Sequence, residues 1–273
     1  MSYRTTCDIS NLSKTKIYRI ACNISSLSKD KHIDGFGRYT LTRSICHKSD
    51  SIYLRLDIFC LAAKQERVIT LHIYIIRHGE TYGNLNGDGF TETDLTPNGE
   101  SQAVRLGERF KAMDVDKIYV SPLIRAVKTA KEIHKFHKDA PVIIDTLLLE
   151  KGTDPDYCGL PDEKLLEQLP SAQIEKRASL GEEDDKKAYE RACKFIEKIK
   201  SENDFDSKIC VVAHGTYNSY LVLAALGFPT KECFNFSHLN TGVSLVCYVE
   251  ENGVIKTKLK YLNDTSHLGL RQE

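Results

Sequence analysis

The sequence has 273 residues, of which 41% are hydrophobic and 28% charged, ordinary values for a globular protein. Lysine plus arginine equals aspartate plus glutamate at 38 each, so bulk charge offers no attraction for nucleic acid or an anionic membrane. No apolar run approaches the roughly 20 residues that span a bilayer. We therefore expect neither a nucleic acid nor a membrane as a partner.

The chain contains nine cysteines, an odd number, and no two of them form a Cys-x-x-Cys pair. Scattered cysteines of this kind suit reduced thiols in a cytosol better than a disulfide framework or a zinc site. We therefore expect a cytoplasmic protein without a bound metal.

The first 70 residues differ from the rest in charge. They hold 12 lysines and arginines against 6 acidic residues, which leaves 26 against 32 for the remaining 203. The pattern of Cys7–Lys16 returns at Cys22–Lys31, and apolar alternation between Ile52 and Phe59 predicts one strand. We interpret residues 1–70 as a poorly ordered or loosely packed N-terminal extension that ends near Val68. Organelle targeting is the alternative, because the segment is basic and rich in serine and threonine.

From residue 71 onward, short apolar runs alternate with amphipathic helical patterns, which is typical of an α/β fold. The run Ile73–Ile76 is rich in β-branched residues and predicts a buried central strand. Thr96-Pro97 then predicts a helix start, because a capping residue precedes a proline suited to the first helical position. A second strand is predicted at Lys117–Val120.

The alternation continues to the end of the pattern. Ser121-Pro122 repeats the helix-start signal, and a further helix is predicted over Asp185–Lys200. A strand follows at Lys208–Ala213. The next helix, Thr216–Leu226, is apolar nearly all round, so we expect it to be buried. These elements predict a three-layer αβα fold with a largely parallel central sheet over residues 71–273.

Charged and polar residues gather where two of these strands end, the usual place for ligands in open α/β sheets. Arg77 and His78 follow the first strand, with Asn84 shortly after, and His214 follows the strand that ends at residue 213. Arg125, in the first turn of its helix, can reach the same edge. The helix after His214 would direct free N–H groups at an anion. Because planar guanidinium groups match phosphate oxygens, the pattern predicts a phosphate pocket.

The same residues can cleave a phosphate ester. Neighbouring cations favour the neutral imidazole of His78, the form that can attack phosphorus, so we expect a covalent phosphohistidine. Arg77, Arg125 and His214 would stabilise the transferring phosphoryl group, and this task needs no metal. Glu150, at the end of an apolar run, is the expected proton donor to the leaving oxygen, because partial burial would raise its pKa.

Four motifs occur in order along the chain: Arg77-His78-Gly79-Glu80-Thr81-x-x-Asn84, Ser121-Pro122-Leu123-x-Arg125-Ala126-x-x-Thr129-Ala130, Leu149-Glu150, and Ala213-His214-Gly215. The segment Leu95-Thr96-x-x-Gly99-x-x-Gln102-Ala103 accompanies them. Together these motifs resemble those of the histidine phosphatase superfamily, also called the phosphoglycerate mutase-like family. The resemblance covers about 200 residues of the chain.

The resemblance implies a phosphoglycerate mutase-like fold, a phosphorylated His78, a phosphate pocket of Arg77, Arg125 and His214, contact of Asn84 with phosphoryl oxygens, proton donation by Glu150, and no cofactor. The segment between Glu150 and His214 resembles that of the phosphatases, because it is short and lacks the long insertion of the cofactor-dependent mutases. This favours hydrolysis. The loop Lys151–Leu160 departs from the family pattern in being longer and in lacking tryptophan.

Three functions follow as hypotheses. The first is a phosphatase of small phosphorylated metabolites or of phosphoproteins, the second a cofactor-dependent phosphoglycerate mutase, and the third a non-catalytic phosphate-binding protein. The presence of every expected chemical group favours an enzyme over the third. We expect substrate specificity in the loops Leu85–Asp94 and Lys151–Lys176. His134 and His137 lack further ligands and are interpreted as surface residues, and the acidic run Glu182–Asp185 as a helix start favoured by the dipole.

Overall fold

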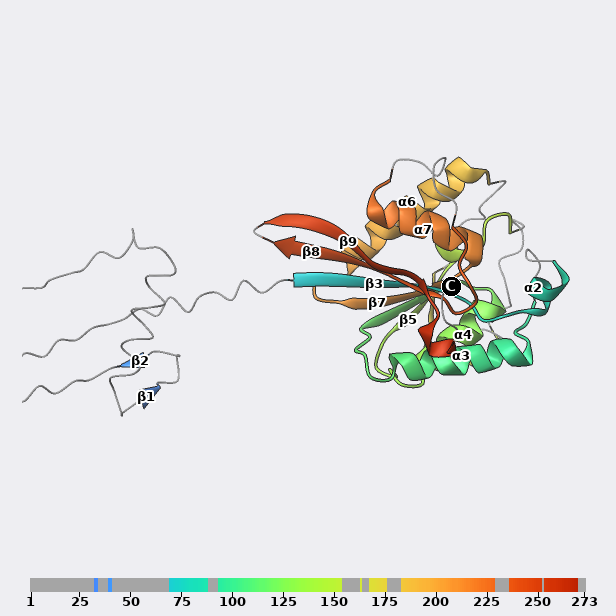
Figure 1. The fold of residues 1–273 in the computed structure, drawn as a ribbon, viewed down its shortest axis with the longest axis horizontal. Coiled ribbons are helices and arrows are strands. Elements are labelled where there is room, and N and C mark those ends of the chain that lie inside the picture. The colour runs from blue at the N-terminus through green and yellow to red at the C-terminus, as the bar shows by residue number, and fades with distance from the viewer. Residues whose placement is uncertain are drawn as a thin grey trace, which may run out of the picture. The chain divides into compact units, whose positions relative to one another are not determined.

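The structure of the protein is a computed structural model that describes residues 32–33, 39–40, 69–87, 93–153, 163, 167–175, 183–228, 236–251 and 253–269. The chain divides into two compact units, Met1–Arg67 and Val68–Glu273. In the first unit, the described residues form β1 (His32–Ile33) and β2 (Tyr39–Thr40), which pair antiparallel (Figure 1). The strand predicted between Ile52 and Phe59 lies outside the described residues.

A seven-stranded mixed sheet forms the centre of the second unit (Figure 1). Its strands are β3 (Ile69–Arg77), β4 (Lys117–Val120), β5 (Val142–Asp145), β6 (Gln173–Glu175), β7 (Lys208–Ala213), β8 (Val243–Glu251) and β9 (Val254–Asp264). They are ordered β6-β5-β4-β7-β3-β8-β9. The strands from β6 to β3 in this order run parallel, whereas β8 and β9 pair antiparallel. The predicted largely parallel sheet is confirmed, and β5, β6, β8 and β9 are additional to the three strands predicted from the sequence.

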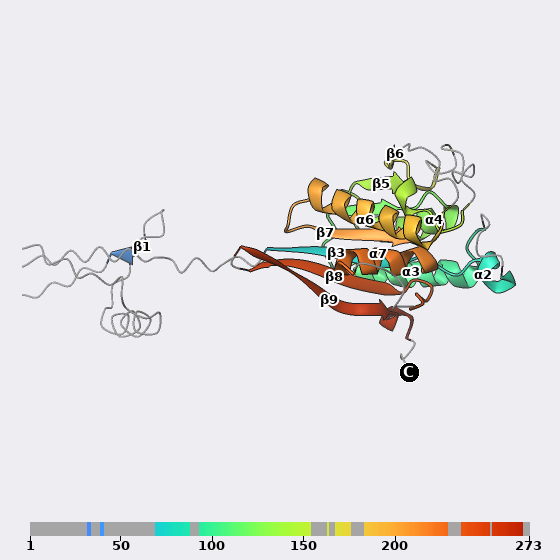
Figure 2. The same ribbon diagram turned by 90° about the horizontal axis from the view of Figure 1, so that it is seen from above.

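Helices cover both faces of the sheet and give three layers (Figures 1 and 2). The long helices are α3 (Pro97–Phe110) and α4 (Ile124–His134) on one face, and α6 (Asp185–Glu202) and α7 (Gly215–Leu226) on the other. Successive β3 side chains alternate between the two cores. Ile73 and Ile75 pack in the core shared with α6 and α7, and Tyr74 and Ile76 in the core shared with α3 and α4. The predicted αβα architecture is confirmed.

Three short elements complete the second unit: α2 (Tyr82–Asn86) and the 3₁₀ turns η1 (Thr146–Leu148) and η2 (Ser266–Leu268). Among the longer helices, the start of α3 follows the sequence signal, because the Thr96 hydroxyl accepts the Gly99 N–H at 2.9 Å. Helix α7 ends at Gly227, whose φ of 73° lies in the left-handed region that glycine adopts readily. The start of α3 and the end of α7 could be predicted because the residues that cap them are neighbours of the helix in sequence.

The helix start predicted at Ser121-Pro122 is wrong. Helix α4 begins at Ile124, and its N-cap residue makes no side-chain capping bond. Ser121 continues the line of the sheet instead, because its N–H donates to the Val212 carbonyl oxygen at 3.0 Å. Its hydroxyl lies 2.7 Å from His214 Nε2. The sequence pattern predicts a helix cap at Ser121, whereas its side chain hydrogen-bonds the distant His214 imidazole.

In the part of the chain that the structure describes, no helix is long and apolar enough to cross a membrane. The cysteines described there, Cys193, Cys210 and Cys247, have free thiols. Cys210 lies in β7 and Cys247 in β8, and burial raises the pKa of both thiols. These two side chains therefore stay protonated and pack as small apolar groups.

Close packing of two glycines joins the start of α3 to the loop that follows β3. A Cβ atom on Gly99 would lie 2.0 Å from the Glu80 carbonyl oxygen, and one on Gly79 would lie 2.5 Å from the Gly99 carbonyl oxygen. Polar contacts hold the same interface: the Thr96 hydroxyl donates to the Glu80 carboxylate at 2.7 Å, and the Glu80 N–H donates to Gln102 Oε1 at 2.9 Å. Helix α3 therefore fixes the position of this loop.

Replacing Gly99 by alanine should destabilise the protein, although alanine is the better helix former by about 1 kcal/mol. The added methyl has no space beside Glu80, so the backbone must shift, and we expect a loss of about 1–3 kcal/mol in the free energy of unfolding by urea. Ser101→Ala, at an exposed position of the same helix, is the control and should change stability by less than about 0.5 kcal/mol. Equal stability of Gly99→Ala and wild type would contradict the close packing.

Candidate active site

Three parallel strands end at one edge of the sheet, and each is followed by a polar residue. His78 follows β3, Ser121 follows β4 and His214 follows β7. Because these strands are neighbours in parallel register, the three side chains meet. The ring centroids of His78 and His214 are 5.2 Å apart, and the Ser121 hydroxyl is 2.7 Å from His214 Nε2.

His78 is held as one tautomer of the neutral imidazole. It is only 3% exposed, and its Nδ1 lies 2.7 Å from the Gly79 carbonyl oxygen. A carbonyl oxygen can only accept, so Nδ1 carries the proton and Nε2 carries the lone pair. Burial first, and then the charges of Arg125 and Arg77, hold the pKa of His78 well below its usual value. The ring is therefore neutral at neutral pH, with Nε2 unprotonated, as a nucleophile requires.

Arg125 lies on the nucleophilic side of this ring. Its Nε donates to His78 Nε2 at 3.2 Å, and the residue is 2% exposed. Thr129 fixes the helical turn that carries it, because the Thr129 hydroxyl donates to the Arg125 carbonyl oxygen at 2.7 Å and accepts the Gly79 N–H at 3.1 Å. Through Thr129, helix α4 thus fixes the position of the Arg125 guanidinium relative to Gly79, the residue after His78.

Two buried nitrogens of this cluster, Arg77 Nε and His214 Nδ1, have no hydrogen-bond partner among the described residues. Arg77 is anchored by Nη1, which donates to the His238 carbonyl oxygen at 2.5 Å. A Cβ atom on Gly215 would lie 3.1 Å from Arg77 Nε, so glycine leaves room for the guanidinium. An unpaired buried polar group costs roughly 1–3 kcal/mol. A bound anion would supply acceptors for both nitrogens.

His214 shares the electrostatic state of His78. Burial first, and then Arg125 and His78, hold its pKa well below the usual value. If the Ser121 hydroxyl donates to Nε2, the proton of the ring sits on Nδ1, where it can be donated to an anion. The pocket thus combines two permanently charged guanidinium groups with two neutral imidazoles.

Asn84 lies beside this cluster, on α2. Its Oδ1 accepts from the Thr81 N–H at 3.2 Å and from Asn240 Nδ2 at 3.1 Å, so its Nδ2 is the group that can donate to a ligand. Asn240 Nδ2 also donates to the His78 carbonyl oxygen at 3.1 Å. Asn240 belongs to no motif recognised in the sequence. The positive φ of 56° at Thr241 shows a tight turn there, and this left-handed position is taken by a threonine and not by the neighbouring Gly242.

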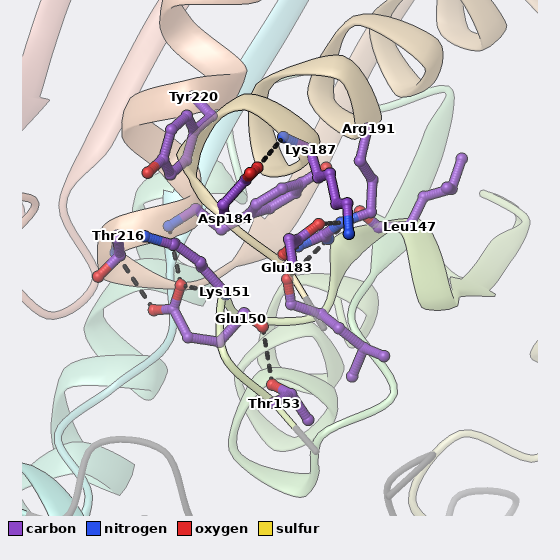
Figure 3. A network of polar contacts seen from close by, with 12 residues as sticks. Leu147, Glu150, Lys151, Thr153, Glu183, Asp184, Lys187, Arg191, Thr216 and Tyr220 are labelled. Atoms are coloured by element: carbon purple, nitrogen blue, oxygen red, sulfur yellow. Dashed lines mark hydrogen bonds and ion pairs between the residues drawn. The ribbon is translucent and has the colours of Figure 1, made fainter. Parts of the chain in front are cut away.

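Glu150 follows η1 and lies at the N-terminal end of α7 (Figure 3). The residue is 7% exposed; its Oε1 accepts the N–H groups of Lys151 at 2.8 Å and Tyr217 at 2.9 Å, and its Oε2 accepts that of Thr216 at 3.2 Å. Burial raises the pKa of Glu150 and outweighs the lowering by these three N–H groups. A carboxyl group with a raised pKa suits proton donation closer to neutral pH.

The first turn of α7 therefore differs from the expectation that it would offer free N–H groups to a bound anion. The N–H groups of Thr216 and Tyr217 bind the Glu150 carboxylate. A helix N-terminus stabilises negative charge, and here an acidic residue of the same chain supplies it. These two N–H groups are therefore not free to contact an external anion.

His134 and His137, which the sequence analysis interprets as surface residues, hydrogen-bond with backbone carbonyl oxygens. His134 Nδ1 hydrogen-bonds with the His137 carbonyl oxygen at 3.1 Å, and His137 Nε2 with the Phe110 carbonyl oxygen at 3.0 Å. Across the described ranges, no three histidine, cysteine, aspartate or glutamate side chains are grouped as ligands for a metal ion.

Comparison with known proteins gives a consistent family. The family model described as the histidine phosphatase superfamily (branch 1) matches residues 73–260, more than half of the chain. Phosphoserine phosphatase 1 of Hydrogenobacter thermophilus is 28% identical over 205 residues, which cover 72% of this chain and 94% of that protein. A broad-specificity phosphatase of Saccharomyces cerevisiae is 26% identical over 215 residues, which cover 73% and 88%.

Solved structures agree on the fold. The phosphoserine phosphatase of Entamoeba histolytica, solved in complex with 3-phosphoglyceric acid, is 26% identical with a TM-score of 0.51 and covers 72% of this chain and 99% of its own. A mycobacterial glucosyl-3-phosphoglycerate phosphatase, 23% identical with a TM-score of 0.54, covers 70% and 98%.

The depressed histidine pKa values predict that His78 and His214 stay neutral on mild acidification. Between pH 7.5 and about 5.5, their imidazole NMR signals, assigned by comparison with His78→Ala and His214→Ala, should not move, whereas unfolded protein in urea should titrate near 6.5. Because the unfolded state then binds more protons, the free energy of unfolding should fall as the pH drops below about 6.5. Titration of both rings near 6.5 in the folded protein would show that the pocket does not exclude protons.

Proposed function

This chain belongs to the histidine phosphatase superfamily and is a phosphoric monoester hydrolase, and we propose that it acts through a covalent phosphohistidine on His78. The observation that carries the proposal is the tautomer of His78. Its Nδ1 proton is engaged by the Gly79 carbonyl oxygen at 2.7 Å, which leaves the Nε2 lone pair facing Arg125. A bound phosphoryl group would take the place of this contact and meet the lone pair.

In the first step, His78 Nε2 attacks phosphorus and the bond from phosphorus to the leaving oxygen breaks. Arg77, Arg125 and His214 hold the non-bridging oxygens and stabilise their charge. Glu150 gives its proton to the leaving oxygen, so the alcohol departs neutral. The Gly79 carbonyl oxygen keeps its hydrogen bond to Nδ1 and stabilises the positive charge that the imidazole gains.

In the second step, water attacks the phosphohistidine and the bond from phosphorus to nitrogen breaks. Glu150, now ionised, takes the proton of that water, and inorganic phosphate leaves. Three backbone N–H groups support the ionised form, while burial supports the protonated form. This balance suits a residue that is acid in one step and base in the next. Asn84 contributes a contact from Nδ2 to a phosphoryl oxygen.

The substrate class that we propose is a small phosphorylated metabolite, with a phosphoprotein as the alternative. The burial of His78 and Glu150, at 3% and 7% exposure, supports a small ester that can enter fully. Relatives named for phosphoserine and for broad specificity support the same class. We also propose a cytoplasmic location, which the free thiols of the described cysteines support.

We propose that residues 71–273 form the catalytic domain and that residues 1–70 are an extension outside it. A fragment starting at Val68, where the second unit begins, should fold and hydrolyse 4-nitrophenyl phosphate with kcat/KM within about threefold of the full chain, because each domain has its own core. The measurement compares the two proteins at equal concentration. A soluble, folded fragment with a loss greater than about tenfold would assign the extension a part in catalysis.

The phosphohistidine can be trapped directly. Protein quenched during turnover of 4-nitrophenyl phosphate should carry acid-labile phosphate on the His78 peptide by mass spectrometry, and His78→Ala should carry none and lose about 10³-fold or more in kcat. Hydrolysis that persists in His78→Ala would overturn the mechanism. The mutase alternative is tested with 3-phosphoglycerate: hydrolysis to phosphate supports the phosphatase, whereas conversion to 2-phosphoglycerate supports the mutase.

A further inference from the structure

A buried arginine outside the four motifs connects to the segment that carries Glu150. Arg191, in α6, is 5% exposed, and its Nη1 donates to the carbonyl oxygens of Leu147 at 2.8 Å and Leu149 at 2.9 Å (Figure 3). Its Nε and Nη2 donate to the two carboxylate oxygens of Glu183 at 2.7 and 2.5 Å. This bidentate pair fixes the plane of the guanidinium.

The same guanidinium contacts the helical turn that binds the Glu150 carboxylate. Its central carbon lies 3.9 Å from the centroid of the Tyr217 ring, and the Tyr217 N–H donates to Glu150 Oε1 at 2.9 Å. Arg191 therefore touches the residue before Glu150 and also one of the residues that hold the carboxylate. Leu149 and Tyr217, which hold Glu150 through the backbone and through its carboxylate, are thus both in contact with the Arg191 side chain.

A second contact ties the other neighbour of Glu150 to the start of α6. Lys151 forms an ion pair with Asp185, and the Tyr220 hydroxyl donates to Asp185 Oδ1 at 2.7 Å. The acidic run at this helix start is therefore more than a response to the helix dipole. Within its described part, Glu183 binds Arg191, Asp184 caps the helix through the Lys187 N–H at 2.8 Å, and Asp185 binds Lys151.

The structure assigns Arg191, oriented by Glu183, as a positioning residue for proton transfer by Glu150; this inference rests on the proposed function. Both side chains of the pair are almost fully buried, at 5% and 6% exposure, so the contact is shielded from water and salt. General acid catalysis contributes about 10²–10⁴-fold, and a misplacement of about 1 Å can cost about 10²-fold. Loss of the guanidinium should therefore affect the proton-dependent part of the reaction.

The test varies the leaving group of the substrate in the full-length protein. Phenyl phosphate needs a proton on its leaving oxygen, whereas 2,4-dinitrophenyl phosphate releases a stable anion of similar shape. Arg191→Met should lower kcat/KM by about 10- to 100-fold for phenyl phosphate and by less than about threefold for the dinitrophenyl ester. A purely structural role would lower both equally, and that result would overturn the inference.

A matched control is available in a second arginine pair, between α3 and β9. Arg109 donates to the Asp264 carboxylate at 2.7 Å and to the Asp264 carbonyl oxygen at 3.2 Å, and its guanidinium lies 5.4 Å from the Tyr261 ring. Arg109→Met thus removes a carboxylate, a carbonyl and a tyrosine contact of the same kinds. It should leave the ratio of the two kcat/KM values unchanged; a change like that of Arg191→Met would contradict a specific role.

Two further variants complete the design. Glu183→Gln keeps the size of the partner and removes its charge, so it should show the same leaving-group selectivity with a smaller loss of about 3- to 10-fold, and it replaces Arg191→Met if that protein does not fold. Glu150→Gln separates the hypotheses. If Glu150→Gln loses kcat/KM equally for phenyl phosphate and the dinitrophenyl ester, the proposed proton donor is wrong. If Glu150→Gln loses more for phenyl phosphate and the Arg191 and Glu183 variants do not, only the positioning role fails.

Discussion

Arg77 and Arg125 carry two positive charges into the carboxyl edge of the sheet, where water is largely excluded. Burial there disfavours any further positive charge, so the imidazoles of His78 and His214 remain neutral. The lone pair of His78 is thereby available near neutral pH without a general base to remove a proton. The same fixed charges favour an anionic phosphoryl group, so in the proposed mechanism one electrostatic constraint both activates the nucleophile and selects the electrophile.

The local parts of the fold follow from the sequence, and the non-local parts do not. Compact β-branched runs define β4 and β7 to the residue, because both strands are buried and bounded by polar residues. The pairing of β8 with β3 joins Ile69 to Glu250, a contact that no local pattern contains. The hairpin that follows β8 did have a signal in its Asn252-Gly253 pair. The helix start predicted at Ser121 is wrong because a capping serine and a serine that hydrogen-bonds a distant histidine look alike in sequence.

The residues of the candidate site also fall into those that the sequence predicts and those that it does not. Arg77 ends β3, His78 and His214 directly follow strands, and Arg125 lies in the first turn of α4, so the convergence of these four residues follows from parallel topology. Asn240 and Arg191 act on backbone carbonyl oxygens far away in the sequence, and such contacts leave no residue pattern. Arg191 and Lys198 also lie on the buried face of α6, where amphipathic periodicity predicts apolar side chains. Their partners, Glu183 and Asp145, become visible only once the fold is known.

Helix α7 carries His214 at its N-cap and binds Glu150 through its first turn, so two groups with different tasks share one rigid body. Thermal displacement of this helix moves both groups together, and their separation is insensitive to that motion. The remaining variable is the position of this pair of groups relative to His78, which directly follows β3. Strand pairing of β3 with β7, directly before His214, limits that variable as well. The relative positions of His78, His214 and Glu150 therefore depend on β3, β7 and α7 and little on the surrounding loops. The loops can then differ in sequence without moving these three groups.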